Sequence, residues 1–277
     1  MNNEHTVLVC PRNDEESLQI IKIAKELRIP MIVSEQGHGA VLENEKDLIE
    51  SIKLVDSAAS AVAIVEIPGV EVEQELQKAG FEVHIIDHHR YNDLDRLNDQ
   101  SSLEQFLDLY EIDDDELKDA GFDLVLIRAV AAVDRGFLWE LQKIGLSDED
   151  QKRAIQYIKE LAYELGRKER KQEEKAARKA WEGRREQGGF LIIESEDDDM
   201  DIRDAVSYFI FDEYGKPTPA IIKQGNRKLY VQETDKAKDL IGKYKGFLFG
   251  GGGCWGMLSP RDGRLAEIDE LIEILHK

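Results

Sequence analysis

Short aliphatic, β-branched runs alternate with amphipathic segments through the first half of the chain, and this alternation most strongly constrains the fold. Apolar residues recur at helical spacing after each of the first three runs. Strands that alternate with helices predict a parallel sheet with helices on its faces. We therefore expect an α/β domain whose strands lie at 6–9, 31–33, 61–65 and 81–86.

Three of these predicted strands end in side chains that can bind a metal ion. Cys10, Asp14 and Glu16 follow the first strand, Glu66 follows the third, and Asp87-His88-His89 follows the fourth. The carboxyl ends of parallel strands share one edge of a sheet, so these residues are expected to converge. Carboxylate and imidazole groups are ligands for divalent metals. The simpler alternative for each segment is an exposed polar loop.

Asp134 is a further candidate ligand. It lies in an apolar stretch at 122–136 that is expected to be helical. A carboxylate in so apolar a segment is costly to bury unless it is paired or bound to metal. The alternative is an acid that reaches solvent beside Arg135.

Composition excludes some classes of function. The 277 residues carry a formal charge of −21, which opposes nonspecific binding to long nucleic acid but allows a small phosphorylated substrate. Two cysteines make a disulfide framework unexpected. With no apolar stretch of about 18 residues and no secretory signal pattern, we expect a cytoplasmic protein without a membrane partner.

The middle of the chain predicts one long helix from Ser147, its expected cap, to about Trp181. From Arg167 onward the helix is rich in basic residues, with glutamates interleaved. That pattern favours a solvated linker stabilised by pairs of opposite charge. The alternative is an electrostatic guide for nucleotide or nucleic-acid phosphates, with Trp181 as a stacking surface.

The second half predicts a smaller α+β domain that begins after Gly188-Gly189. Strands are expected at 190–193, 206–211 and 247–249, a hairpin at 220–231, and helices at 235–244 and 265–276. Gly250–Gly253 would let the backbone approach a ligand and present N–H groups to an anion. Trp255 could stack on a base or belong to the core, and the sequence favours neither.

Taken together, these motifs resemble the DHH phosphoesterase superfamily, which includes RecJ-type exonucleases, nanoRNA and cyclic-dinucleotide phosphodiesterases, and manganese-dependent pyrophosphatases. Cys10-x-x-x-Asp14-x-Glu16 has the spacing of the family's His-x-x-x-Asp-x-Asp motif with two substitutions. Glu66 and Asp134 occupy the places of the second and fourth motifs, and Asp87-His88-His89 is the third motif intact. Gly250–Cys254 resembles the Gly-Gly-Gly-His loop of the DHH-associated domain.

The resemblance implies two divalent ions, with manganese favoured and zinc or magnesium as alternatives. Cys10 and Asp14 would bind one ion, and a bridging Glu66 would share it with a second ion held by Glu16, His88 and Asp134. Asp87 and His89 are implied as catalytic, with His89 meeting the substrate phosphate. Substrate contacts are implied for Gly251, Gly252, Gly253, Cys254 and Trp255.

The resemblance also predicts the domains and the function. We expect a parallel-sheet DHH-type domain at 1–146, a linker helix at 147–187 and a substrate-binding α+β domain at 188–277. The expected activity is hydrolysis of a small phosphorylated substrate, such as a short oligonucleotide or cyclic dinucleotide, at an interdomain cleft. Because Cys10, Glu16 and Glu66 depart from the family pattern, a catalytically degenerate protein that binds nucleotide, nucleic acid or a protein partner is the alternative. A homodimer is left open.

Overall fold

A computed structural model describes residues 5–37, 39–89, 91, 94–166, 170–249 and 253–276. The chain forms two compact units, one of residues 1–135 with 144–166 and the other of residues 136–143 with 167–277. Among the described residues, no helix combines the length and the apolarity needed to cross a bilayer.

The first unit is built on a parallel sheet with the strand order β2-β1-β3-β4. Its strands are β1 (Thr6–Pro11), β2 (Met31–Ser34), β3 (Ala61–Val65) and β4 (Glu82–Ile86). Thr6 pairs with Ala61, and Ala61 pairs with Glu82. The parallel strands β1, β3 and β4 therefore start at the same level and end at the same edge of the sheet. The predicted parallel sheet is confirmed, and its carboxyl edge collects the residues that follow these strands.

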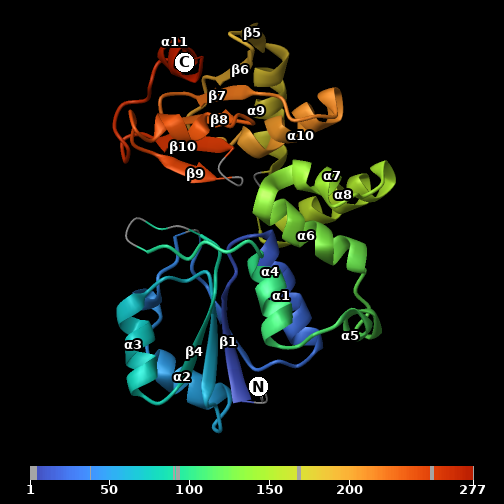
Figure 1. The fold of residues 1–277 in the computed structure, drawn as a ribbon, viewed down its shortest axis with the longest axis vertical. Coiled ribbons are helices and arrows are strands. Elements are labelled where there is room, and N and C mark those ends of the chain that lie inside the picture. The colour runs from blue at the N-terminus through green and yellow to red at the C-terminus, as the bar shows by residue number, and fades with distance from the viewer. Residues whose placement is uncertain are drawn as a thin grey trace. The chain divides into compact units, whose positions relative to one another are not determined.

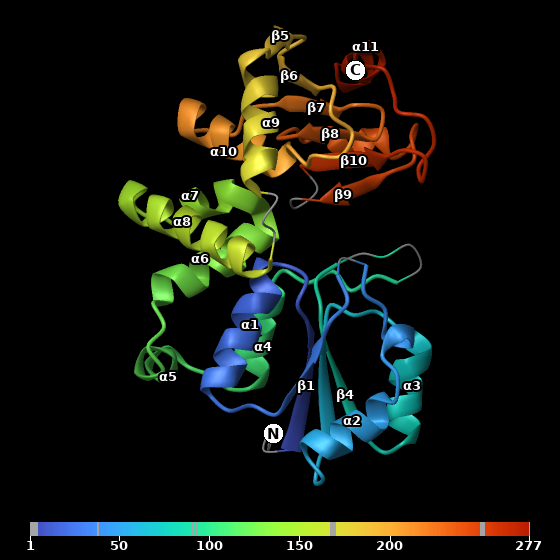
Figure 2. The same cartoon turned by 180° about the vertical axis from the view of Figure 1, so that it is seen from behind.

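Helices cover both faces of this sheet (Figures 1 and 2). α1 (Glu15–Glu26) and α4 (Ser102–Leu109) lie on one face, and α2 (Leu48–Val55) and α3 (Val70–Lys78) lie on the other. Since neighbouring strand residues point to opposite faces, Leu8 packs with the first helix pair and Val7 with the second. The unit is completed by η2 (Leu42–Asn44), α5 (Asp114–Asp119), α6 (Leu124–Gly136) and α8 (Asp148–Glu164).

The expectation of one continuous helix from Ser147 to Trp181 is wrong. The segment forms α8 and α9 (Arg170–Glu182), which belong to different units. α8 ends where Gly166 adopts a left-handed φ of +83°, a conformation that costs glycine little and stops a helix. The Trp181 ring is buried beneath the Arg184 guanidinium, which makes it a packing residue.

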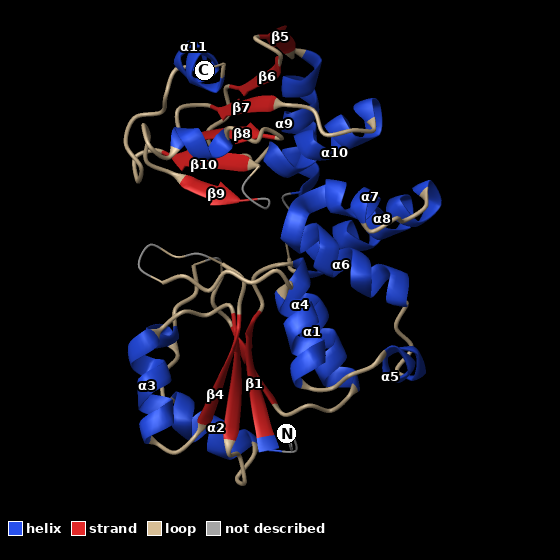
Figure 3. Ribbon diagram, viewed as in Figure 1, coloured by secondary structure: helices blue, strands red, loops and turns tan. Residues whose placement is uncertain are grey.

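The second unit contains a mixed sheet with the strand order β5-β6-β7-β8-β10-β9 (Figure 3). Its strands are β5 (Arg185–Gln187), β6 (Phe190–Ser195), β7 (Ala220–Gln224), β8 (Lys228–Gln232), β9 (Phe247–Phe249) and β10 (Cys254–Leu258). β6 and β7 are parallel and the other pairs are antiparallel. The remaining elements are η3 (Phe137–Trp139), α7 (Glu140–Lys143), α10 (Arg203–Tyr214), η4 (Ala237–Leu240) and α11 (Ile268–Leu275). The predicted α+β class is confirmed.

Two predictions within this unit are wrong. The segment 206–211, expected as a strand, lies inside α10, because Val206, Phe209 and Ile210 are buried at helical spacing. Gly215, with a φ of +60°, ends that helix. The helix expected at 235–244 is only the short η4 turn.

Replacing Phe106 by alanine tests the core between α4 and the sheet. The ring is fully buried and packs against Tyr110 with ring centroids 5.1 Å apart. Phe106→Ala is expected to lower the free energy of unfolding by about 3–5 kcal/mol, because it removes a large buried side chain and leaves a cavity. Urea denaturation followed by circular dichroism measures this loss. Leu54→Ala, at a position 87% exposed, is the control and should change stability by less than about 0.5 kcal/mol.

Candidate metal centre

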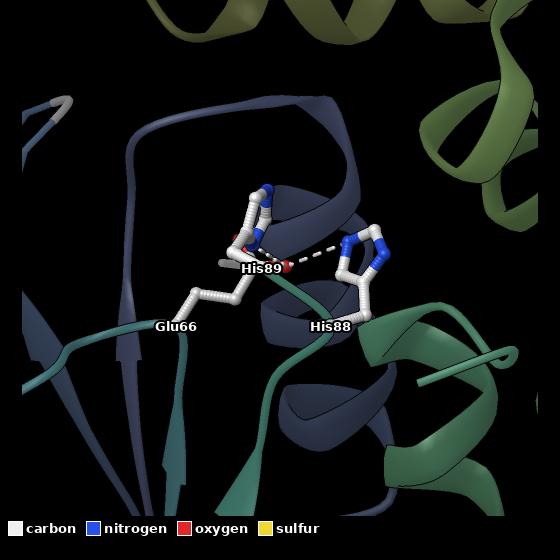
Figure 4. A group of neighbouring side chains, drawn as sticks. All are labelled: Glu66, His88 and His89. Carbon is white, nitrogen blue, oxygen red and sulfur yellow. Dashed lines mark ion pairs between the residues drawn. The ribbon is translucent and has the colours of Figure 1, made fainter. Parts of the chain in front are cut away.

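The turn after β3 directs Glu66 into the carboxyl edge of the sheet. Glu66 adopts a left-handed φ of +49°, which costs a non-glycine residue about 1–3 kcal/mol. Its backbone N–H donates to Ile86 O at 3.0 Å, which ties the turn to the end of β4. Figure 4 shows the resulting arrangement, in which the Glu66 carboxylate points toward the rings of His88 and His89.

Four predicted ligands converge at this edge. His88 Nε2 lies 2.7 Å from Asp134 Oδ2 and 3.4 Å from Glu66 Oε1. One ligand atom from each of Glu16, Glu66, His88 and Asp134 lies within 4.8 Å of the others, and we call these residues the four-residue cluster. Glu16 comes from the first turn of α1 and Asp134 from the end of α6. A second group shares Glu66 and His88 and adds His89.

Three atoms of the cluster are buried without a hydrogen-bond partner among the described residues: Glu16 Oε2, His88 Nε2 and Asp134 Oδ2. His88 and Asp134 form an ion pair, although their atoms do not meet the geometric criteria of a hydrogen bond. Buried polar atoms are nearly always paired, so three converging exceptions require an explanation. A divalent cation would satisfy all three, and a mixed oxygen and nitrogen set suits manganese or zinc. The residues therefore fit a bound metal ion.

Burial and mutual repulsion perturb the carboxylates. Burial, followed by the charges of Asp134 and Glu66, raises the pKa of Glu16 well above its usual range. Burial and the charge of Glu66 raise the pKa of Asp14 to about 6. In the metal-free protein, protons on these groups relieve part of the negative charge that a cation would otherwise neutralise.

His88 supplies the opposite charge. Burial alone would lower its pKa, but contacts with Asp134 and Glu66 outweigh burial and raise the pKa to about 10. Burial alone would raise the pKa of Asp134, whereas its contacts with His88 lower it. An imidazolium at position 88 therefore occupies part of the role of a cation when no metal is bound.

Asp87 orients His89 rather than joining the four-residue cluster. Its Oδ1 accepts the His89 backbone N–H at 2.9 Å and lies 3.2 Å from His89 Nδ1, while its Oδ2 accepts the Tyr91 hydroxyl at 2.9 Å. The Asp87 side chain is fully buried, whereas that of His89 is 48% exposed. Burial opposes protonation of His89, but Asp87 and then Glu66 raise its pKa. Figure 4 shows the second ring nitrogen of His89 pointing away from Glu66.

Cys10 and Asp14 stay outside the group of converging ligand atoms. Cys10 Sγ lies 3.6 Å from Pro11 O and 3.7 Å from Ser17 O, as a buried thiol donor. Burial, with the charge of Asp14, raises the pKa of this thiol. Asp14 caps α1 by accepting the Ser17 N–H at 2.8 Å. Their binding of a separate ion stays a prediction.

The residues predicted to contact substrate in the C-terminal part are only partly described. Gly251 and Gly252 lie outside the described residues. Gly253 lies immediately before β10. Cys254 is the first residue of this strand and is buried. Trp255 is fully buried in the core of the second unit, so the core interpretation holds and no ring face is exposed for a base.

Sequence reasoning missed the residues that hold the ligands in place. Ser102 and Gln105 of α4, together with Tyr91, donate hydrogen bonds to Glu66 or Asp87. The capping pattern Ser101-x-x-Glu104 could have located the start of α4. The strand ends that this helix contacts could not be read from that pattern.

No protein-family model matches the sequence, and no curated protein matches it in a sequence search. Among solved structures, the chain is similar to exonuclease RecJ bound to manganese, at 13% identity and a TM-score of 0.41, over 98% of this chain and 88% of that one. It is also similar to the pGpG-specific phosphodiesterase PggH from Vibrio cholerae, at 13% identity and a TM-score of 0.43, over 98% and 99% of the two chains. An uncharacterized protein from Helicobacter pylori G27 matches at 10% identity and a TM-score of 0.36, over 98% and 99%.

The parallel four-stranded sheet followed by a second sheet agrees with the expected DHH-type two-domain fold.

The pKa shifts predict how the stability of the metal-free protein depends on pH. Asp14, Glu16 and His88 all have raised pKa values, so each binds its proton more tightly in the folded chain than in the unfolded chain. The stabilisation from His88, whose pKa is about 10, should therefore be lost as pH rises from 6 to 9, by roughly 1–3 kcal/mol, whereas that from Asp14, whose pKa is about 6, is lost mainly below pH 6. Thermal unfolding of chelator-treated protein at both pH values measures this loss.

Added Mn²⁺ should raise the melting temperature more at pH 8 than at pH 6, because metal and protons compete for the same ligands. His88→Ala should flatten the pH dependence. Equal melting temperatures at pH 6 and pH 9, with no metal effect, would contradict this electrostatic description.

Proposed function

We propose that this protein is a divalent-metal-dependent phosphoesterase that hydrolyses a small phosphorylated substrate, such as a short oligonucleotide or a cyclic dinucleotide. The observation that carries the proposal is the convergence, at the carboxyl edge of a parallel sheet, of three buried ligand atoms that have no hydrogen-bond partner among the described residues. His89 lies beside them with its side chain half exposed. A metal that polarises a phosphoryl oxygen, with an accessible donor beside it, suits phosphoryl transfer.

The chain's own residues have separate roles in this proposal. Glu16, Glu66, His88 and Asp134 would hold a divalent ion, which when bound would polarise a phosphoryl oxygen and acidify a water molecule. Asp87 holds the His89 ring through Nδ1, so the other ring nitrogen is free to donate to a phosphoryl oxygen. Manganese, and a second ion at Cys10 and Asp14, are proposed from the motif resemblance.

The charge of the chain supports a small substrate. A formal charge of −21 repels a long polyanion, whose binding depends mainly on neutralising many phosphates. A substrate with one or two phosphoryl groups needs only local cations. His89, with its raised pKa, and a bound metal ion would supply them.

His88 and His89 variants separate metal binding from chemistry. His88→Ala should remove bound metal and abolish hydrolysis, because it deletes a ligand. His89→Ala should keep the metal content within about threefold while lowering turnover roughly 10²–10⁴-fold, as expected for loss of a donor to the reacting group. Elemental analysis and a hydrolysis screen with Mn²⁺, Zn²⁺ or Mg²⁺ measure both effects. The screen would use short oligonucleotides, cyclic dinucleotides and pyrophosphate.

The control is His5→Ala, which removes an exposed histidine that pairs with Asp56. It should change neither metal content nor turnover. Hydrolysis that survives His88→Ala would refute the proposed site. Wild-type protein that binds metal but cleaves no substrate would instead support the catalytically degenerate alternative.

A further inference from the structure

Two consecutive residues at the start of α4 donate hydrogen bonds to two different residues of the four-residue cluster. The fully buried Ser102 hydroxyl donates to Glu66 Oε1 at 2.7 Å. The backbone N–H of Leu103 donates to Glu16 Oε1 at 2.9 Å. These bonds join the end of β3 and the start of α1 to the same helix terminus.

The next two residues contact the remaining segments that carry ligands. Glu104 accepts hydrogen bonds at both carboxylate oxygens, at 2.9 and 2.8 Å, from Nη1 of Arg135, the neighbour of Asp134. Gln105 holds the backbone of Asp87 at both ends, because its Oε1 accepts the Asp87 N–H at 3.3 Å and its Nε2 donates to Asp87 O at 3.1 Å. Residues 102–105 thus contact four separate segments of the site in succession.

We infer that Ser102 and Gln105 are positioning residues of the metal centre, with Ser102 fixing the Glu66 carboxylate and Gln105 fixing the turn that carries His88 and His89. The two residues are three positions apart and so lie on one face of α4. The inference rests on the proposed function, since it assigns supporting residues to the same site. It adds that α4 sets the geometry in which the ligands meet the ion.

The hydrogen bond from Ser102 completes the positioning of the Glu66 carboxylate. The left-handed backbone of Glu66 fixes where its side chain begins, and the hydroxyl then fixes the rotation of the carboxylate. Oε1, which accepts this bond, also lies 3.4 Å from His88 Nε2 and 3.7 Å from His89 Nδ1. Hydrogen bonds of this kind from outside the ligand shell commonly change metal affinity 10- to 100-fold.

The test titrates Mn²⁺ into the full chain and measures free ion by electron paramagnetic resonance, with hydrolysis assayed in parallel. Ser102→Ala should raise the dissociation constant about 10- to 100-fold, whereas Ser102→Thr keeps a hydroxyl and should stay within about threefold of wild type. Gln105→Leu should weaken binding in the same direction. Ser147→Ala removes a cap hydrogen bond from α8, so it controls for loss of stability alone and should leave affinity unchanged.

The outcomes separate this inference from the proposed function. If Ser102→Ala and Gln105→Leu bind Mn²⁺ as tightly as wild type does, the positioning role is overturned and the proposed function is untouched. If the threonine variant is as weak as the alanine variant, the role of the hydroxyl is overturned. If the wild-type protein binds metal but hydrolyses no substrate, the proposed function is contradicted. The ratio of each variant's Mn²⁺ dissociation constant to that of wild type still tests the inference. Wild-type protein that binds no metal overturns both.

Discussion

The buried negative charge at the carboxyl edge of the parallel sheet is the constraint on which the site depends. Glu16, Glu66 and Asp134 meet a single imidazole, His88, within 4.8 Å. Carboxylates removed from water at such short range repel one another and are stable only with protons or a cation between them. The raised pKa values of Glu16 and His88 indicate that protons take this role in the metal-free protein, and the buried atoms without a hydrogen-bond partner mark where a cation would fit.

The fold supplies the ligands from elements that are far apart in sequence. The strand ends of β3 and β4 provide Glu66 and His88, while helices provide Glu16 and Asp134. The side chains of these ligands can rotate out of position unless other groups hold them. The first residues of α4 contact all four of these segments, so one short helix ties the strand ends to α1 and α6. Rigid placement of this kind is what metal chemistry requires.

The sequence predicted the part of the site that follows from strand order. Glu66, His88 and Asp134 could be placed together because parallel strands share an edge and because an acid in an apolar helix needs a partner. Cys10 and Asp14 are also predicted as ligands; their side chains contact Ser17 in the first turn of α1, and their binding of an ion stays a prediction. The contacts of α4 could not be predicted, because a capping pattern does not show which strand ends a helix faces.

The second unit shows the same limit in a different form. The run 206–211 is apolar enough for a strand, and only its packing against the sheet, through Val206, Phe209 and Ile210, decides that it is helical. Trp255 likewise became a core residue once the neighbouring strands were in place. Local composition therefore identified the class of this unit, while tertiary packing determined its elements.

The most direct test of the central claim is anomalous diffraction at the manganese edge from crystals of the wild-type protein soaked in Mn²⁺. We expect an anomalous peak bounded by Glu16, Glu66, His88 and Asp134, with His88 Nε2 and a carboxylate oxygen of Asp134 as ligands. Absence of a peak there, with those atoms bonded instead to water or protein, would contradict it.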